Sequence, residues 1–344
     1  MVEPDGAMQT LVLETPGVFA WQEIAEPEPG SGEVLVRVRR CGVCGTDIHA
    51  FAGRQPFFTY PRRLGHELAV EVLDAPADAS VVPGDVCAVE PYYFCGSCAA
   101  CRHGKTNCCE RLQVLGVHID GGHTPLMTVP ADKLHVNATL SLEELALVEP
   151  LVIGAHAVER AALVPGEPAV VVGMGPIGLG VALYAKAAGA DLAVVDVNED
   201  RLDFARRALG TEQAVMAGDG LPERLRSAFG GDLPRAVFDA TGSPPAMHAS
   251  FALPDHGGRM IFVGLFQGDF TFHDPDFHRR EMTLLSSRNG RPDNFRHVLA
   301  SLADGSVDAR PLITHRYHFD EMPARFPELT QTPGLIKAMI TIDD

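Results

Sequence analysis

The stretch "AVVVGMGPIGLG", from Ala169 to Gly180, decides the fold of this 344-residue chain. Its opening run of apolar and β-branched residues predicts a buried strand, and the apolar run that ends it predicts a helix. Between the two lies the pattern G-x-G-x-x-G, formed by Gly173, Gly175 and Gly178. Glycines at these places permit a tight turn, a close approach of the backbone to a pyrophosphate, and close packing of helix on strand. The stretch therefore predicts a dinucleotide site at the N-terminus of the helix.

The strand that follows, "DLAVVD", ends in Asp196, 18 residues beyond Gly178. A carboxylate at that distance can accept hydrogen bonds from a ribose diol, and its charge would repel a 2′-phosphate. We expect Arg201 on a helix capped by Asn198, so Asp196 favours NAD over NADP as the cofactor. Other residues expected at the nucleotide site lie in the glycine loop and after later strands: Pro176, Ile177, Thr241, Val263 and Gly264.

Strands and helices keep alternating beyond Asp196. The segments "AVMA", "RAVFDAT" and "GRMIFVGL" predict strands, and "LPERLRSAF" and "PPAMHASFAL" predict the helices between them. This alternation predicts an α/β fold whose second half is a doubly wound parallel sheet of about six strands. We expect "GRMIFVGL" at the edge of that sheet, where two subunits could pair.

The sequence before about Val148 consists of short β-rich runs bounded by Gly and Pro, such as "GEVLVRVRRCGVCG", "ELAVEVLDA" and "GDVCAVEPYY". Such runs predict an antiparallel β domain. Its loops and its end carry residues able to bind a metal or move a proton: Cys44, Thr46, Asp47, His49, His66, Glu67 and Glu149. Taken singly these residues are ordinary, and spacing alone leaves a mononuclear metal site undecided because no short ligand pair is present.

The stretch "FCGSCAACRHGKTNCC", Phe94 to Cys109, holds five of the eight cysteines. Four of them are spaced C-x2-C-x2-C-x7-C, which favours a closed, structural zinc site: Cys95, Cys98, Cys101 and Cys109. Cys108 is then a small apolar neighbour, or replaces Cys109 as a ligand after a one-residue slip. An iron–sulfur cluster is the rival reading, but such a run normally continues with Pro, and Glu110 stands there. Disulfides are disfavoured in a reducing compartment.

The charge balance excludes some partners. There are 28 Lys and Arg against 45 Asp and Glu, a formal charge of -17 that would repel nucleic acid and anionic membranes. The longest weakly polar run, from Pro168 to Ala185, is broken by glycines and a proline, so we expect no membrane span. The first residues lack a basic flank and an apolar core, so we expect no secretory signal, a cytoplasmic location and a small-molecule partner.

The motifs "CGVCGTDIH", "GHE", "GDVCAVEP", the four-cysteine lobe, "VEPL" and "VVGMGPIGLG" occur in the order seen in zinc-dependent medium-chain alcohol dehydrogenases. The chain resembles that family from Met8 almost to its end, and most resembles its polyol, sugar-acid and threonine dehydrogenase branch. Glu149 stands where the simple-alcohol enzymes have a second cysteine ligand. The resemblance implies a GroES-like catalytic domain, residues 1–152 and 287–344, and a Rossmann NAD-binding domain, residues 153–286. It also implies a homotetramer, with a dimer as the alternative.

The same resemblance implies two zinc ions per chain and a hydride transfer from a secondary alcohol to NAD. Cys44, His66 and Glu149 would hold the catalytic zinc, while Glu67 would stay outside the ligand set because a third anion would weaken the zinc's pull on the substrate oxygen. Thr46 would take the substrate's proton and pass it through the cofactor ribose toward His49. At Lys337 a basic residue could reach the cofactor phosphates, or could be a solvated surface lysine.

Residues implied to border the substrate cleft are polar, cationic or aromatic: Arg54, Phe57, Tyr60, His118 and Arg288. They suit a polyhydroxylated or carboxylated substrate, because a pocket built to bond hydroxyls rejects analogues that lack them. Sugar acids such as L-galactonate come first, ahead of L-fucose-like sugars, sorbitol-type polyols, L-threonine and simple alcohols. The segment "HTPLM", His123 to Met127, departs from the family pattern and could reshape this wall. A lyase or epimerase with zinc and NAD, or a non-catalytic nucleotide-binding protein, remains an alternative.

Overall fold

The computed structural model describes residues 7–56 and 58–342, and the chain divides into two compact units. The first unit comprises Met1–Glu149, Arg291–Gly305 and Ile313–Asp344, and the second comprises Pro150–Gly290 and Ser306–Leu312. Within the described part of the chain, no helix is both long enough and apolar enough to cross a membrane.

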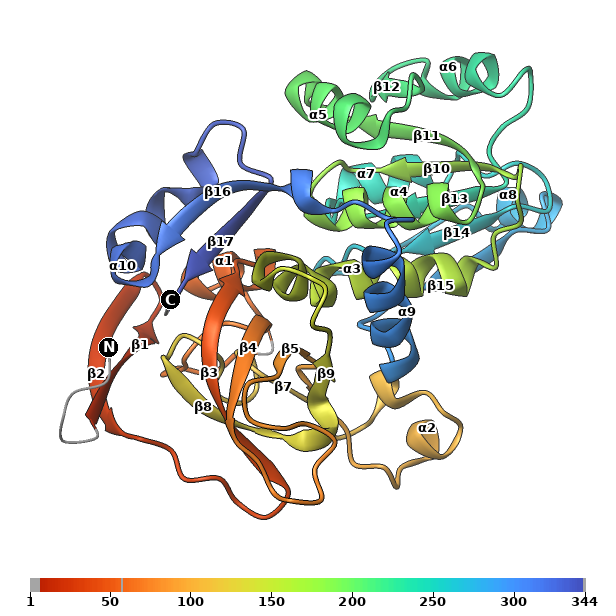
Figure 1. Cartoon of the computed structure of the whole chain (residues 1–344). Helices are drawn as coiled ribbons and strands as arrows, with labels where there is room; N and C mark the ends of the chain where they lie inside the picture. The colour runs from red at the N-terminus through yellow and green to blue at the C-terminus, as the bar shows by residue number, and fades with distance from the viewer. Residues whose placement is uncertain (1–6, 57, 343–344) are drawn as a thin grey trace. The chain divides into compact units, whose positions relative to one another are not determined.

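The second unit is built on a six-stranded parallel sheet with the order β12-β11-β10-β13-β14-β15 (Figure 1). The strands are β10 (Pro168–Val172), β11 (Asp191–Asp196), β12 (Ala214–Met216), β13 (Ala236–Asp239), β14 (Arg259–Phe262) and β15 (Thr283–Ser286). The order reverses between β10 and β13, which is where nucleotides bind in doubly wound sheets. The predicted parallel sheet is confirmed. The prediction that "GRMIFVGL" forms its edge is wrong, because β15 pairs with the whole of β14.

Helices connect these strands: α4 (Pro176–Ala187), α5 (Glu199–Leu209), α6 (Leu221–Ala228), α7 (Pro244–Ser250) and α8 (Asp274–Arg279). As predicted, the Asn198 side chain caps α5, accepting a hydrogen bond of 3.2 Å from the backbone N–H of Arg201. The same helix ends at Gly210, whose φ of 61° is the left-handed conformation that glycine adopts without strain. The central strands β10 and β13 are apolar and buried almost throughout, because helices cover both faces of the sheet.

The first unit is built on a seven-stranded sheet with the order β16-β17-β3-β4-β5-β9, and β8 also pairs with β3. The strands are β3 (Glu33–Gly42), β4 (Glu67–Asp74), β5 (Val86–Val89), β8 (Leu126–Pro130), β9 (Leu134–Val136), β16 (Ile313–His318) and β17 (Lys337–Thr341). All pairs except β16 with β17 are antiparallel. The C-terminal strand β17 therefore pairs with β3.

Smaller elements complete the first unit. They are the hairpin β1 (Ala7–Thr15) and β2 (Val18–Ala25), the pair β6 (Tyr92–Tyr93) and β7 (Gln113–Val114), and the helices α1 (Gly45–Phe51), α2 (Ala99–Arg102), α9 (Pro292–Ala303) and α10 (Met322–Arg325). Alternate residues of β3, such as Val34, Val36 and Val38, are fully buried in the core of this unit.

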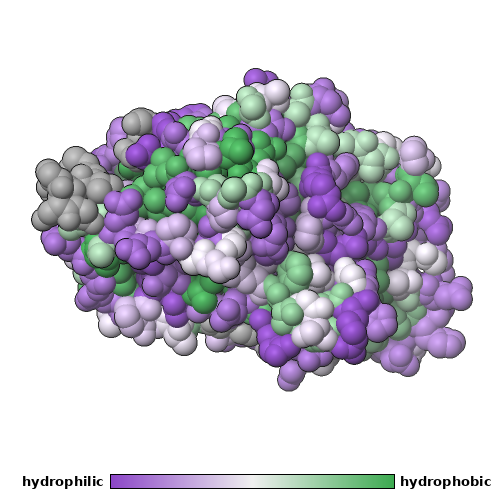
Figure 2. All heavy atoms as spheres, turned by 60° about the horizontal axis from the view of Figure 1, so that its bottom comes forward, coloured by the Kyte–Doolittle hydropathy of each residue, from purple (hydrophilic) through white to green (hydrophobic). Residues whose placement is uncertain are grey.

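On the face drawn in Figure 2, hydrophobic patches are interspersed with hydrophilic residues.

The helix α3 (Leu142–Ala161) continues through Glu149 and Pro150, at which the two units divide. The predicted domain boundary between residues 152 and 153 also falls inside this helix. Proline lacks the N–H that would bond one turn back, yet the helix runs on for more than two turns beyond it. Glu149 is therefore carried by regular helix on both sides, which restricts where its carboxylate can reach.

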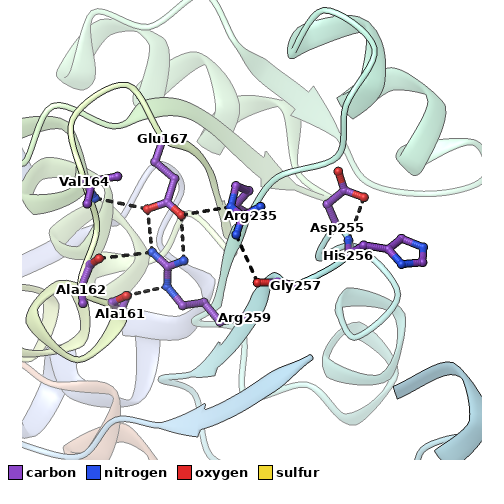
Figure 3. Close-up of polar contacts among 9 residues, drawn as sticks. All are labelled: Ala161, Ala162, Val164, Glu167, Arg235, Asp255, His256, Gly257 and Arg259. Carbon is purple, nitrogen blue, oxygen red and sulfur yellow. Dashed lines mark hydrogen bonds and ion pairs between the residues drawn. The ribbon is translucent and has the colours of Figure 1, made fainter. Parts of the chain in front are cut away.

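A partly buried ion pair fixes the C-terminal end of α3 in the second unit (Figure 3). Two guanidinium nitrogens of Arg259, at the start of β14, donate to the two Glu167 carboxylate oxygens at 2.8 and 2.7 Å. Arg259 Nε also donates to the carbonyl of Ala161, the last residue of α3. The backbone N–H of Val164 donates to Glu167 at 3.2 Å. The cluster thus joins the helix end to two strands of the sheet.

Candidate metal and nucleotide sites

Three of the predicted metal-site residues meet where β3, α1 and β4 come together. Cys44 lies at the N-cap of α1, His66 directly precedes β4, and Glu67 is the first residue of β4. One ligand atom from each of the three lies within 4.8 Å of the other two. His66 and Glu67 are 5% and 0% exposed, so these donors face a dry environment.

Asp47 holds Cys44 and faces His66. Its Oδ2 accepts a 2.9 Å hydrogen bond from the backbone N–H of Cys44, and its Oδ1 lies 3.6 Å from Nδ1 of His66. Carboxylates in this position fix the ring orientation of metal-binding histidines. The sequence analysis included Asp47 among the residues able to bind a metal or move a proton, but did not expect it to hold Cys44 and face His66. Its signal was its spacing, three residues beyond Cys44, which is that of a carboxylate returning to a helix N-cap.

Glu149 lies outside the group of three, but it belongs to the same electrostatic environment. It is 6% exposed, and Oε1 accepts a hydrogen bond from the hydroxyl of Tyr92, a residue that the sequence analysis missed. Burial raises the pKa of Glu149 to about 7, with His66 opposing and Glu67 adding to the rise. Burial lowers the pKa of His66, but Asp47 and Cys44 outweigh it, so that the net shift is strongly upward.

These shifts show that acidic groups are crowded at this place. Four acidic side chains surround one imidazole, and thiol, imidazole and carboxylate are the donors that zinc prefers. A divalent cation would relieve the repulsion among them, so the residues present fit a zinc ion.

Glu67 already has a cationic partner. Lys337, the first residue of β17, is 3% exposed, and its Nζ lies 2.6 and 2.7 Å from the two carboxylate oxygens of Glu67. Nζ also donates to the carbonyl of Val43 at 3.0 Å. The expectation that Lys337 is a solvated surface lysine is wrong, because this lysine is buried and all three of its donors are used.

The predicted proton-relay residues Thr46 and His49 both lie on α1. Three residues apart, they share one side of the helix, and His49 is exposed whereas Thr46 is partly buried. Partial burial and the nearby Arg54 guanidinium lower the pKa of His49. His49 is therefore neutral near pH 7 and able to accept a proton.

The four predicted zinc-lobe cysteines form a second cluster. The sulfur atoms of all four lie within 4.8 Å of one another: Cys95, Cys98, Cys101 and Cys109. Backbone N–H groups of Cys95 and Cys98 donate to neighbouring sulfurs at 3.3 Å, as they do around thiolates that bind a metal. Hydrogen bonds from Ser97, Arg111 and Cys98 lower the pKa of Cys95 to about 5. Cys108 is exposed and lies outside the cluster, so the donor chemistry fits a structural zinc ion held by the other four.

The glycine loop in the second unit leaves room for a ligand. A side chain at Gly178 would meet the carbonyl of Gly173 at 1.7 Å, and one at Gly173, where φ is 95°, would meet Thr241 at 2.9 Å. A side chain at Gly175 would meet nothing within 4 Å. Gly173 and Gly178 are thus required by packing, whereas the space above Gly175, at the N-cap of α4, fits a pyrophosphate.

Asp196 lies at the C-terminal end of β11 and holds the glycine loop. Its Oδ2 accepts a 2.6 Å hydrogen bond from the backbone N–H of Met174, and its Oδ1 accepts one of 2.9 Å from that of Asn198. The Arg201 guanidinium approaches the same carboxylate at 4.0 Å. A carboxylate oxygen accepts more than one hydrogen bond, so Asp196 remains able to receive a ribose hydroxyl.

Asp239, at the end of β13, was missed by the sequence analysis although it organises this edge of the sheet. Its Oδ1 accepts hydrogen bonds from the backbone and hydroxyl of Thr241 at 2.9 and 2.6 Å. Its backbone carbonyl accepts from the N–H groups of Val263 and Gly264, both at 2.9 Å. The predicted residues Thr241, Val263 and Gly264 therefore lie together, next to Gly173, while Pro176 and Ile177 begin α4.

The predicted substrate residues lie in different surroundings. Arg54 is exposed beside His49, while Tyr60 donates its hydroxyl to the Ala50 carbonyl, and His118 accepts a hydrogen bond from Val114 within its own loop. Arg288 is exposed in the second unit. Phe57 lies outside the described residues.

The departing segment from His123 to Met127 is buried in the first unit. His123 is 0% exposed and packs against Phe19 and Phe319, with ring centroids 6.5 and 5.9 Å away. Leu126 and Met127 begin β8, which pairs with β3. The segment is therefore part of the core of this unit.

A six-stranded nucleotide-binding sheet joined in one chain to a β-rich unit with a three-donor metal cluster and a four-cysteine lobe defines a class, the zinc- and nicotinamide-dependent dehydrogenases. Family models agree: the alcohol dehydrogenase GroES-like domain matches residues 30–138, and the zinc-binding dehydrogenase model matches residues 176–304. The chain belongs to the zinc-dependent medium-chain alcohol dehydrogenase family, and zinc and a nicotinamide dinucleotide are its cofactors.

Individual relatives place the chain within that family. It is 41% identical to L-galactonate-5-dehydrogenase of Escherichia coli K12, over 97% of this chain and 99% of the relative. It is 36% identical to D-altritol 5-dehydrogenase of Agrobacterium fabrum, over 95% of this chain and 96% of the relative. Among solved structures, an alcohol dehydrogenase from Escherichia coli CFT073 complexed with NADH superposes with a TM-score of 0.91 at 26% identity, covering 98% of this chain and all of that one.

Proposed function

We propose that this dehydrogenase oxidises a secondary alcohol of a sugar acid, or of a related sugar or polyol, with NAD as the acceptor. The observation that carries the proposal is the donor set of partly buried Cys44 and buried His66 and Glu149, with a glutamate where the simple-alcohol enzymes have a cysteine. It is supported by substantial identity to relatives that are named for oxidising carbon 5 of L-galactonate and D-altritol.

In this proposal each residue of the first unit has a defined role. Cys44, His66 and Glu149 hold the catalytic zinc, and Asp47 and Tyr92 orient His66 and Glu149. When bound, zinc supplies a Lewis acid that favours loss of the substrate hydroxyl's proton. The Thr46 hydroxyl accepts that proton as it gives up its own, and His49, neutral and exposed on the same side of α1, takes up the relayed proton and delivers it to solvent.

The second unit would bind NAD. The pyrophosphate lies over Gly175 at the N-terminus of α4, and the Asp196 carboxylate accepts from the adenosine ribose. Asp196 is 5% exposed and its nearest described cation, Arg201, only reaches 4.0 Å, so a 2′-phosphate would meet an incompletely neutralised anion. NAD is therefore the preferred cofactor.

The Arg54 guanidinium is the cation that we assign to a substrate carboxylate. It is exposed and close enough to His49 to lower the pKa of that residue, so it lies beside the expected path of the proton. An anionic sugar acid would gain a charge-assisted hydrogen bond there that a neutral polyol cannot make. We also propose a cytoplasmic homotetramer, with a dimer as the alternative; the mass of the purified protein in solution tests this.

The decisive experiment is initial-rate reduction of NAD and of NADP by the zinc-loaded enzyme on sugar acids, aldoses, polyols, L-threonine and simple alcohols. We expect turnover confined to polyhydroxylated substrates, with kcat/KM highest for a hexonate and NAD preferred. The R54Q variant should lose about 1.5–3 kcal/mol of transition-state binding on a hexonate, but little on the matched hexitol. Equal losses on both would remove Arg54 from the carboxylate site, and turnover of simple alcohols alone would contradict the substrate class.

A further inference from the structure

Glu67 is the one residue of the three-donor group that is already fully engaged. Its ligand atom lies within 4.8 Å of those of Cys44 and His66, yet both of its oxygens contact Lys337 Nζ. The two residues are 270 positions apart in the sequence, and both are at least 97% buried. A buried ion pair of this kind needs excellent geometry to offset its desolvation, and here every donor of the ammonium group is satisfied.

The strand β3 is shaped to let the two side chains meet. It lies between β4 and β17, and its last residue, Gly42, pairs with Glu67 on one side and with Met339 on the other. A side chain at Gly42 would meet Oε2 of Glu67 at 2.0 Å and its Cβ at 3.1 Å. Only glycine leaves room at this position, so the backbone itself is fitted to the Glu67 carboxylate.

Charge counting shows what the pair does for a metal. The Cys44 thiolate and the Glu149 carboxylate together neutralise a zinc dication, and Glu67 with Lys337 adds no net charge. Without the lysine, a bare carboxylate would lie beside the cation in a dry site, where the attraction between them is strong. Four protein ligands would then close the tetrahedron, and closed zinc sites are structural.

We propose that Lys337 is a positioning residue that holds Glu67 out of the ligand set and so keeps one coordination position open for substrate. This inference rests on the proposed ligands Cys44, His66 and Glu149. Loss of the lysine's charge converts an open catalytic site into a closed one, in which zinc is held more tightly and the substrate competes with Glu67.

The test compares zinc release to a chelating dye from the wild type and from the K337M, K337R, E67Q and E67Q/K337M variants. The C101S variant, which lacks one lobe ligand, identifies the release phase of the structural ion. In K337M we expect catalytic zinc to leave about tenfold more slowly and kcat/KM to fall about 10- to 100-fold. K337R keeps the charge and should release zinc like the wild type. E67Q/K337M should regain the wild-type release rate, because the competing carboxylate is gone.

Circular dichroism spectra show whether each variant is folded, and the double variant separates charge from packing. If Lys337 served only packing, E67Q/K337M would release zinc no closer to the wild-type rate than K337M does, and that result would overturn the inference. So would faster or unchanged zinc release from K337M. Zinc release is measured without substrate, so failure of the substrate assignment leaves this test intact. If the wild type shows a single release phase and C101S abolishes it, the chain binds no catalytic zinc. That result would contradict both proposals.

Discussion

At the scale of single residues, His123 is the clearest misfit between chemistry and surroundings. It is fully buried in an aromatic environment, and neither ring nitrogen has a hydrogen-bond partner among the described residues. Burial, and to a smaller extent His66, lowers the pKa of His123 to about 3. An unsatisfied buried polar group costs about 1–3 kcal/mol of folding free energy.

Replacing this imidazole by a ring of similar shape should stabilise the protein. We expect H123F to raise the free energy of unfolding by about 1–3 kcal/mol at pH 7. The unfolded histidine takes up a proton below about pH 6.5, whereas the folded one does so only near pH 3. Wild-type stability therefore falls as the pH drops below about 6.5, and H123F should flatten that fall. Thermal unfolding at several pH values measures both effects, and equal pH slopes would contradict the assignment.

Residue-scale features divide into local ones, which the sequence predicts, and distant ones, which it does not. The glycine loop and the four cysteines are set by short spacings, so they could be found from the sequence. The contacts of Glu67 with Lys337 and of Glu149 with Tyr92 join residues 270 and 57 positions apart. No local pattern encodes such pairs, because they depend on how elements distant in the sequence pack together: β4 and β17 lie on either side of β3, and Glu149 of α3 meets Tyr92 of β6.

At the scale of elements, the ion pair of Glu167 with Arg259 decides how α3 ends. The bidentate pair connects Glu167, directly before β10, with Arg259 of β14, and Arg259 also bonds the last residue of α3, whose N-terminal half carries Glu149. The Arg259 guanidinium, by hydrogen bonding, holds the pKa of Glu167 below its usual value. The nearby Arg235 approaches the same carboxylate only at 3.7 Å, and its side chain is 52% exposed.

We expect R259M to lower the free energy of unfolding by about 2–3 kcal/mol at pH 7, because it leaves the Glu167 carboxylate with only the half-exposed Arg235 as a cationic neighbour. The R235M control should cost less than about 1 kcal/mol, as exposed ion pairs do. The pKa of Glu167 is lower in the folded protein than in the unfolded chain. The ion pair therefore contributes its full stabilisation of the folded state above the unfolded pKa, and this contribution is lost as the pH falls through the folded pKa. The R259M deficit should therefore shrink in acid. Denaturant unfolding at pH 7 and pH 4 measures it, and a deficit independent of pH would argue for packing alone.

The sheet order shows why strand position was harder to predict than strand existence. The periodic apolar runs identified the strands of the second unit, but "GRMIFVGL" was expected at the edge. The true edge strand, β15, has only four residues, and three of them are exposed: Thr283, Leu284 and Ser286. A short strand with exposed side chains gives a weak apolar signal, although pairing of its backbone with β14 is complete.

At the scale of the whole molecule, the metal lobe belongs to one unit and the nucleotide loop to the other. Zinc binding to a four-cysteine loop contributes to folding directly, since the ligands are not assembled in the unfolded chain. Loss of this ion should therefore weaken the first unit and leave the second one able to bind its cofactor.

We expect the C101S variant to carry one zinc per chain in place of two and to show an additional, lower-temperature unfolding transition in calorimetry. NAD binding, followed by calorimetric titration, should persist after that first transition. A variant with one zinc and an unchanged melting profile would show that the lobe adds nothing to the stability of the first unit.

The place of β17 in the first sheet has a consequence for biosynthesis. This strand lies against β3, yet the ribosome makes it after every strand from β10 to β15. The nucleotide-binding sheet can thus close on the nascent chain while β3 still exposes an unpaired edge, and such edges invite aggregation. Chains stalled before Lys337 should be cut by protease in the first unit and protected in the second. The first unit is therefore the part that needs chaperone protection until β17 has been made.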